Sequence, residues 1–196
     1  MNPLAALPHP DAATLDRLHA QLVDAAAADD TLDIAYRTVD TPLGPLLLAA
    51  TPAGLLRVAY ESEGHDTVLT SLAERVSPRV LQAPGRLDDV AREIEDYFAG
   101  RRRTFDLPLD LQLAHGFRRE VLTHLPDIAY GTTASYSAVA AAAGRPTAVR
   151  AVGTACAVNP LPIVIPCHRV VRSDGSIGAY LGGVAAKQTL LSLEAA

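Results

Sequence analysis

Turn residues divide the segment between residues 34 and 62 into short runs, and this pattern constrains the fold more than any other feature of the chain. Pro42 and Gly44 interrupt one run of β-forming residues, and Pro52 and Gly54 interrupt the next. Runs of this length, separated by Pro and Gly, are typical of antiparallel strands joined by tight turns. The segment therefore predicts a small antiparallel sheet.

Segments with helical periodicity follow the predicted sheet. Residues 66–76 and 87–98 carry apolar side chains at three- and four-residue spacing, and the second segment ends at Gly100. A basic, extended connector then covers residues 101–112. Strands followed by helices predict an α+β domain over residues 34–110.

A separate amphipathic helix is predicted ahead of this domain. Within residues 10–30, Leu15, Leu18 and Leu22 recur at three- and four-residue spacing among good helix formers. The segment is acidic and rich in alanine, so we interpret residues 1–33 as an extension appended to the main fold.

The second predicted domain, residues 111–196, is mainly helical. A helix over residues 116–125 is expected to stop near Pro126, and a final helix covers residues 184–193. Between them, residues 159–165 are rich in proline and predict a strand or an extended segment.

Two short helices in this domain predict a helix-turn-helix. Ser135 is a suitable N-cap for a helix that ends before Gly144, and Thr147 is expected to cap a second helix that runs through Ala157. Helical hairpins of this kind also occur in proteins that do not bind DNA, so the pattern alone leaves DNA binding open.

Composition limits the class of protein. Of the 196 residues 49% are apolar and 20% charged, which is enough for a buried core. No apolar stretch approaches the roughly 20 residues of a membrane span. The first residues lack the basic and apolar parts of a secretory signal, so we expect a cytoplasmic protein without membrane contact. Two cysteines, Cys156 and Cys167, cannot form a disulfide scaffold or, alone, a four-ligand zinc site.

Charge is divided unevenly along the chain. The net charge is −5, but residues 1–100 carry −9 and residues 101–196 carry +4. Any affinity for phosphate groups therefore belongs to the second half.

A possible nucleophile stands in this basic half. Cys167 follows an apolar run and Pro166, and His168 comes next. A thiol with an ordinary pKa of about 8.5 is mostly protonated at neutral pH, so a nucleophilic cysteine needs a base or a positive field. Histidine can be that base, in a tight turn or through a bridging water, with a carboxylate such as Glu194 fixing its ring. By itself the pair also fits a buried structural cysteine beside a surface histidine.

The residues around this pair form a longer signature. In chain order its parts are Gly131 with Ser135-Tyr136, Arg150-Ala151-Val152-Gly153, Asn159-Pro160, Pro166-Cys167-His168-Arg169-Val170, Ser173-Asp174-Gly175 with Gly178 and Tyr180, and Gly182-Gly183 with Lys187, Leu190-Leu191 and Glu194. In these residues the chain resembles the O6-alkylguanine-DNA alkyltransferases, also called methylated-DNA-protein-cysteine methyltransferases. A looser match upstream, at Thr41-Pro42-Leu43-Gly44 and residues 94–100, extends the resemblance over about residues 34–194.

The resemblance implies a fold and a reaction. The fold would be a small ribonuclease H-like N-terminal domain followed by a winged-helix-like C-terminal domain. The reaction would be DNA repair by direct reversal, in which the alkyl group of O6-alkylguanine in double-stranded DNA moves irreversibly to a cysteine after the base has been flipped out. O4-methylthymine is a further candidate lesion. The protein would need no cofactor and would act once, as a monomer.

The same resemblance implies roles for five residues. Cys167 would accept the alkyl group, with His168 as its water-linked base and Glu194 as the carboxylate that orients His168. Asn159 would hold the turn that carries the cysteine. Tyr136 would crowd the target phosphate and form a hydrogen bond with the flipped base.

The resemblance also implies DNA contacts and a base pocket. Arg150, on the second helix of the helix-turn-helix, would enter the base stack in place of the flipped guanine. Further DNA contacts are expected at Ser135, Ala151, Gly153 and Arg169. The pocket would be formed by the 173–183 loop and its neighbours, namely Tyr180, Leu181, Gly182, Val170 and Pro166.

Leu181 departs from the family pattern, because relatives often carry a small or polar residue there. Its side chain could line the pocket or project toward the protein surface, and we favour the second arrangement because the adjacent glycines allow close backbone approach without side chains. The histidines of the first half have no cysteine partner there, so no metal site is expected.

Two other classes of function compete with repair. A regulator could use the same helix-turn-helix without chemistry, as could a relative that only recognises alkylated bases, but neither would need Cys167 beside His168, Asn159 and Glu194. A cysteine hydrolase would need an oxyanion hole and a turnover cycle, for which the resemblance gives no support.

Overall fold

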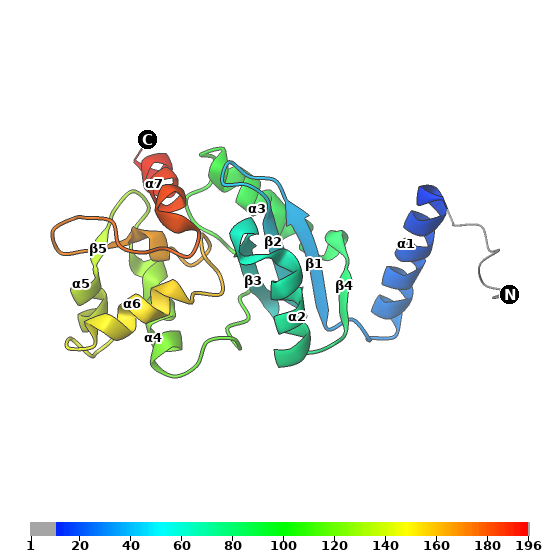
Figure 1. Cartoon of the computed structure of the whole chain (residues 1–196), viewed down its shortest axis with the longest axis horizontal. Coiled ribbons are helices and arrows are strands. Elements are labelled where there is room, and N and C mark those ends of the chain that lie inside the picture. Colours follow the sequence, from blue (N-terminus) through cyan, green and yellow to red (C-terminus); the bar gives the residue numbers. More distant parts are fainter. Residues whose placement is uncertain (1–10, 196) are drawn as a thin grey trace, which may run out of the picture.

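The computed structural model describes residues 11–195, and within them the N-terminal part is built on a four-stranded sheet (Figure 1). Strands β1 (Ile34–Val39), β2 (Leu46–Thr51) and β3 (Gly54–Tyr60) form the antiparallel meander that the turn residues predict. A short strand that the sequence analysis missed, β4 (Val80–Gln82), pairs in parallel with β1 and gives the order β3-β2-β1-β4. The sheet is therefore mixed rather than purely antiparallel.

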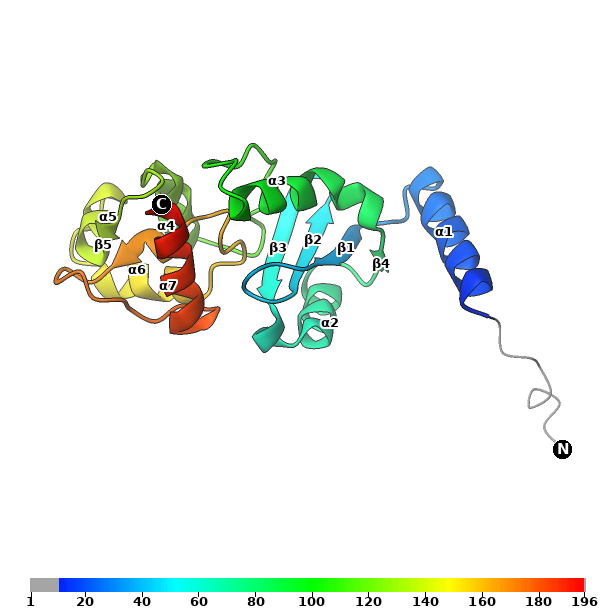
Figure 2. The same ribbon diagram turned by 90° about the horizontal axis from the view of Figure 1, so that it is seen from above.

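Helices α2 (His65–Arg75) and α3 (Asp88–Phe98) cover opposite faces of this sheet, as Figure 2 shows. Both confirm the predicted helical segments. Because side chains alternate along a strand, Leu46 and Leu48 of β2 pack on the α3 side, whereas Leu47 and Ala49 pack on the α2 side. Burial of both faces explains why β2 is apolar at every position but its last.

The connector closes over the edge of the sheet at β3. Gly54 has a φ of +138°, and a Cβ built there would lie 2.3 Å from the carbonyl oxygen of Pro108. Leu55 N–H donates to that oxygen at 2.8 Å, and Asp110 N–H donates to Leu55 O at 2.9 Å. Glycine is therefore required at this point for the connector to approach.

Helix α1 (Ala12–Ala28) confirms the predicted N-terminal helix, although residue 10 of that prediction lies outside the described part of the chain. Asp11 caps it by accepting from Thr14 N–H at 2.8 Å. The helix lies at the end of the molecule opposite the C-terminal part (Figure 1). His19 Nε2 donates to Gln82 O at 2.6 Å, whereas the leucines that made the helix amphipathic remain about half exposed.

The C-terminal part is a helical domain with a two-stranded parallel ladder. Its helices are α4 (Phe117–His124), α5 (Tyr136–Ala142), α6 (Val149–Ala157) and α7 (Gly183–Glu194), and its strands are β5 (Ala134–Ser135) and β6 (Val170–Val171). Short 3₁₀ turns cover Leu125–Asp127 and Cys167–Arg169 in this domain, and Glu61–Glu63 and Pro84–Leu87 in the N-terminal part. Helices α5 and α6 pack against each other and against α4, which gives the predicted helix-turn-helix.

Two local predictions in this domain are wrong. Ser135 caps α5 as expected, by accepting from Ala138 N–H at 3.1 Å, but Ala148 rather than Thr147 occupies the N-cap of α6 and makes no side-chain bond there. Residues 159–165 form a series of turns rather than a strand, and Ile163 has a left-handed φ of +75°. The side chain of Asn159 forms hydrogen bonds with backbone groups of this segment, in competition with the bonds that a strand would make. This explains why the segment does not extend.

None of the helices in residues 11–195 is both long enough and apolar enough to cross a membrane.

Candidate active site

A buried 3₁₀ turn brings Cys167, His168 and Arg169 together immediately after Pro166. Arg169 N–H donates to Pro166 O at 3.0 Å, and all three side chains are buried. Because a 3₁₀ turn rotates about 120° per residue, three successive side chains point in three directions. Cys167, His168 and Arg169 therefore meet different neighbours, although they are adjacent in sequence.

Asn159 contacts the sulfur of Cys167 and fixes the turns that precede it. Its Nδ2 donates to Cys167 Sγ at 3.1 Å and to Ile165 O at 2.9 Å, while its Oδ1 accepts from Leu161 N–H at 3.0 Å. Asn159 is completely buried, so all of these hydrogen bonds are shielded from solvent. One side chain thus joins the cysteine to both ends of the 159–165 segment.

The thiol of Cys167 is protonated at neutral pH in this environment. Burial raises the pKa of Cys167 to about 11, although the hydrogen bond from Asn159 and the charge of Lys187 act in the opposite direction. Lys187, on α7, is itself fully buried and donates to Val170 O at 2.5 Å. A reaction that uses the thiolate therefore requires a base.

His168 is placed to be that base. Its Nε2 and Glu194 Oε1 are 2.8 Å apart, and both side chains are buried. Burial lowers the pKa of His168, so the ring is neutral at pH 7 despite the opposing effect of Glu194. A neutral ring that donates from Nε2 has an unprotonated Nδ1, and this atom has no hydrogen-bond partner among residues 11–195. The free acceptor of His168 is thus able to take up a proton.

Glu194 is held by more donors than His168 alone. Arg169 contributes two bonds of 2.9 Å, Tyr97 Oη donates to Oε1 at 2.7 Å, and Gly131 N–H donates to Oε2 at 3.2 Å. Burial alone would raise the pKa of Glu194, but the bonds from His168, Arg169 and Tyr97 together lower it to about 2. The carboxylate is therefore ionised at neutral pH.

A groove beside α6 adjoins this site. It has a volume of about 550 Å³ and is lined by Tyr136, Val149, Arg150, Gly153, Thr154, Ala157, Arg172, Gly178 and Ala179. Arg150 is exposed at α6, and a Cβ built on Gly178 would lie 2.5 Å from Tyr136 Oη. Burial, together with the nearby sulfurs of Cys156 and Cys167, raises the pKa of Tyr136. Tyr136 thus lines the groove and lies near both sulfurs.

Comparison with known proteins identifies the family. The model of the 6-O-methylguanine DNA methyltransferase ribonuclease-like domain matches residues 34–111, and that of the DNA-binding domain of the same proteins matches residues 116–196. The chain belongs to the methylated-DNA–protein-cysteine methyltransferase family. The resemblance predicted from the sequence is confirmed.

Individual relatives agree with this assignment. The methylated-DNA–protein-cysteine methyltransferase of Mycolicibacterium paratuberculosis is 40% identical over 161 residues, which cover 82% of this chain and 92% of that protein. The constitutive enzyme of Bacillus subtilis is 38% identical, over 81% of this chain and 94% of its own. The crystal structure of the Mycobacterium tuberculosis O6-methylguanine methyltransferase superposes with a TM-score of 0.73 at 36% identity, covering 83% of this chain and 93% of that one. A structure of the same mycobacterial protein in complex with DNA gives a TM-score of 0.71.

Some residues expected at the DNA surface of this methyltransferase lie elsewhere. Arg169 was expected to contact DNA, but only 6% of it is exposed, and its guanidinium is bonded to Glu194 and to Ile128 O. The prediction of a DNA contact at Arg169 is therefore wrong. Ser135 lies at the N-cap of α5, whereas Ala151 and Gly153 lie on α6, where Ala151 is exposed and Gly153 lines the groove.

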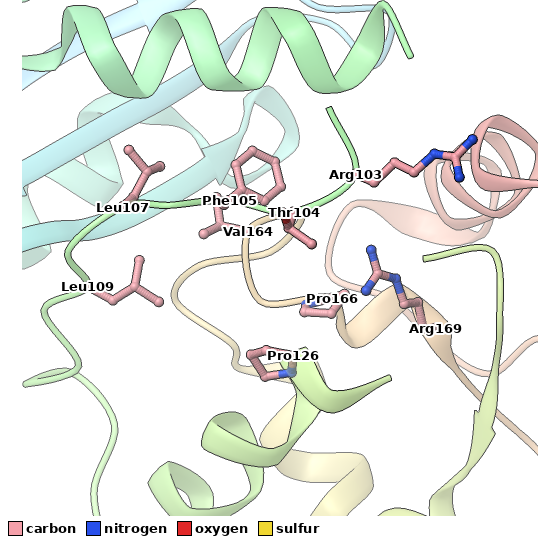
Figure 3. A pocket seen from close by; sticks show the side chains of 9 residues that line it. All are labelled: Arg103, Thr104, Phe105, Leu107, Leu109, Pro126, Val164, Pro166 and Arg169. Atoms are coloured by element: carbon pink, nitrogen blue, oxygen red, sulfur yellow. The ribbon is translucent and has the colours of Figure 1, made fainter. Parts of the chain in front are cut away.

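The residues expected to form the base pocket lie in different parts of the C-terminal domain. Pro166 faces a different cavity of about 110 Å³, which it lines together with Arg169, Val164 and connector residues such as Arg103 and Phe105 (Figure 3). Pro166 is not among the residues that line the α6 groove, and its place in the base pocket stays a prediction. Val170 is fully buried and contributes its carbonyl group to Lys187.

The loop after β6 is anchored to the ribonuclease-like domain. Tyr180 Oη and Tyr60 Oη are 2.9 Å apart, and a Cβ built on Gly182 would lie 2.6 Å from the Tyr60 ring. Leu181 lines a cavity of about 340 Å³ shared with Arg57 and Glu63, not the α6 groove. Whether the Leu181 side chain lines the base pocket stays a prediction.

Sequence reasoning missed the contributions of the first domain. Tyr97 and Tyr60 reach the site from α3 and β3, and neither belongs to the recognised C-terminal signature. Within the described residues, no group of three or more His, Cys, Asp and Glu side chains is arranged to hold a metal ion.

Proposed function

We propose that this protein repairs alkylated DNA by direct reversal, transferring the methyl group of O6-methylguanine to Cys167 in one irreversible step. The observation that carries the proposal is the arrangement of His168. Its Nε2 is tied to an ionised Glu194, its Nδ1 is free among the described residues, and the adjacent thiol needs a base. This is the arrangement of a nucleophile with an oriented general base.

The transfer balances without a cofactor. The thiol proton passes to Nδ1 of His168, directly or through one water, and the sulfur bonds to the methyl carbon as the bond from that carbon to O6 breaks. The proton given up by the thiol returns to guanine N1, so the products are a thioether and ordinary guanine. A thioether has no easy route back to a thiol, and each molecule therefore acts once.

Duplex DNA containing alkylated guanine is the proposed partner, and the α6 groove is the proposed entry. O6 of a stacked guanine is out of reach of a buried sulfur, so the base must leave the helix. Arg150, exposed at the groove, would fill the gap, and Tyr136 would contact the flipped base and its phosphate. The same family pattern supports Ser135, Ala151 and Gly153 as DNA contacts.

Access to the sulfur requires movement. Cys167 is only 1% exposed, and Tyr136 and Tyr180 both lie near it. We propose that the 173–183 loop shifts as the base enters, with Tyr180 and Gly182 forming the wall of the base pocket. Action as a monomer in the cytoplasm, and activity on O4-methylthymine, belong to the same proposal.

Stoichiometry tests the proposal directly. A duplex carrying methyl-labelled O6-methylguanine should transfer its label until one methyl is bound per protein, and then stop. Repeated turnover would contradict the single-use mechanism. Tight binding to one particular sequence with no label transferred would instead indicate a regulator.

A further inference from the structure

The ribonuclease-like domain contacts the cysteine site, that is Cys167, His168, Asn159 and Glu194, at one point of direct chemical consequence. Tyr97 of α3 is completely buried, and its hydroxyl donates to Glu194 Oε1 at 2.7 Å. The same hydroxyl lies 3.5 Å from Nε2 of His168. A residue 71 positions before the histidine thus shares the oxygen to which the histidine is bonded.

Packing holds the Tyr97 ring in place. Its centroid lies 5.3 Å from that of Phe105 in the connector and 6.2 Å from that of Tyr130 in the second domain. Val90 and Ile94, on the same face of α3, are buried against the sheet. The hydroxyl is therefore positioned by elements of both domains, so it loses little further freedom when it bonds to Glu194.

The phenol donates its proton in a hydrogen bond to Glu194 and does not give it up. Burial and the neighbouring carboxylate of Glu194 raise the pKa of Tyr97 far above its ordinary value, so the hydroxyl keeps its proton at neutral pH. Oε1 of Glu194 thus accepts simultaneously from Tyr97, from Arg169 Nη2 and from His168 Nε2. These three bonds leave the carboxylate little freedom to rotate, and its orientation decides which ring nitrogen of His168 carries the proton.

We propose that Tyr97 is a positioning residue of the cysteine site, whose hydroxyl holds Glu194 against Nε2 of His168 and moderates the basicity of the imidazole. The inference rests on the proposed methyl transfer, in which His168 is the base. It makes the ribonuclease-like domain a working part of the reacting site rather than a support for the DNA-binding domain.

The sign of the effect follows from the charges around His168. The groups that face it are Arg169 of its own turn, Glu194 and Lys187 of α7, Tyr180 of the following loop and Tyr97 of α3, and Cys167 precedes it in the same turn. Removing the Tyr97 hydroxyl takes one donor from Glu194 and leaves the other charges unchanged. More negative charge then remains on Oε1, which stabilises protonated His168, so the pKa of His168 rises.

Tyr97→Phe tests this in the full-length protein. The single-turnover rate of methyl transfer from a duplex falls at low pH as His168 becomes protonated, and in the variant we expect this fall to begin roughly half a pH unit higher. The rate on the high-pH side should drop about tenfold, since part of the contribution of the general base depends on its orientation. A role in packing alone would lower the rate without moving the pH profile.

Two matched proteins complete the test. Tyr130→Phe removes a hydroxyl that donates only to Leu193 O, at 3.3 Å, in the same aromatic cluster, and should leave the pH profile in place. Fluorotyrosine introduced at Tyr97 keeps the shape of the ring and is a stronger donor, so it should move the fall to lower pH. This second substitution remains informative even where Tyr97→Phe folds poorly.

The outcomes separate the two proposals. Wild-type protein that transfers no methyl group would overturn the proposed function. Wild-type protein that transfers normally, with unchanged pH profiles for Tyr97→Phe and for the fluorotyrosine protein, would overturn only the positioning role of Tyr97.

Discussion

Replacing Glu194 by glutamine is expected to destabilise the folded protein by about 3 kcal/mol at pH 7, and by much less in acid. Glutamine has the shape of a protonated carboxyl group, so the variant resembles the protein with Glu194 neutral. It leaves the buried guanidinium of Arg169 without its anionic partner, which is costly in a protein interior.

The magnitude follows from the shifted pKa. The carboxyl group has an ordinary pKa of 4.5 and a folded-state pKa of about 2, because the bonds from His168, Arg169 and Tyr97 outweigh the effect of burial. A difference of about 2.5 units corresponds to about 3 kcal/mol. Since the folded-state value is the lower one, this stabilisation is complete above the unfolded pKa and is lost as the pH falls toward 2. At pH 3 about 1.5 kcal/mol should remain.

Urea unfolding of the wild-type and Glu194→Gln proteins at pH 7 and pH 3 measures the difference in their free energies of unfolding. Glu120→Gln is the matched control, because Glu120 pairs with Arg145 at 3.6 Å on the surface and both side chains are at least half exposed. We expect the control to change the free energy of unfolding by less than about 1 kcal/mol at either pH. A loss for Glu194→Gln that is the same at both pH values would refute the assignment of the stabilisation to an ionised, buried carboxylate.

Three further substitutions test the α6 groove and the base pocket. Arg150→Ala should slow transfer from duplex DNA more than reaction with the free alkylguanine base, because only the duplex needs a side chain to hold the stack open; equal losses in the two rates would place Arg150 in folding or chemistry. Gly153→Ala should raise the free energy of unfolding by up to about 1 kcal/mol, since alanine is the better helix former and no neighbouring atom lies within 4 Å of the added Cβ. The same substitution should weaken DNA binding, measured by titration with an unmodified duplex. Leu181→Gly should leave the ratio of inactivation rates by benzyl and methyl guanine within about tenfold of wild type, as expected for a change worth about 1 kcal/mol; a much larger gain for the benzyl substrate would place the side chain in the pocket.

The sequence predicts those parts of the fold that local patterns determine. Turn residues locate the β1–β3 meander, and periodic apolar positions locate α2 and α3. Strand β4 escapes because three residues are too few to show a pattern, and it forms only because β1 offers a free edge. Residues 159–165 look like a strand because they are apolar, but the buried side chain of Asn159 binds their backbone groups and bends them.

The candidate site likewise has residues that the sequence predicts and residues that it does not. Cys167, His168, Asn159 and Glu194 are found through motifs that keep their order along the chain, and the structure brings them together. Tyr97 could not be found, because a buried tyrosine on an amphipathic helix has the same pattern whether its hydroxyl is bonded or not. Arg169 was misplaced because its sequence neighbours do not reveal that its guanidinium turns inward to Glu194.

Cys167 as the methyl acceptor is the central claim, and one mass measurement tests it. Trypsin cleaves after Arg150 and Arg169, which places Cys156 and Cys167 on one peptide, and fragmentation of that peptide distinguishes the two sulfurs. After incubation with an excess of methylated duplex, the fragments that contain Cys167 should gain the mass of one methyl group in place of a proton, in full yield. Cys167→Ser protein should gain nothing while still binding DNA. A methyl group found on Cys156, or repaired DNA beside an unmodified Cys167, would contradict the account.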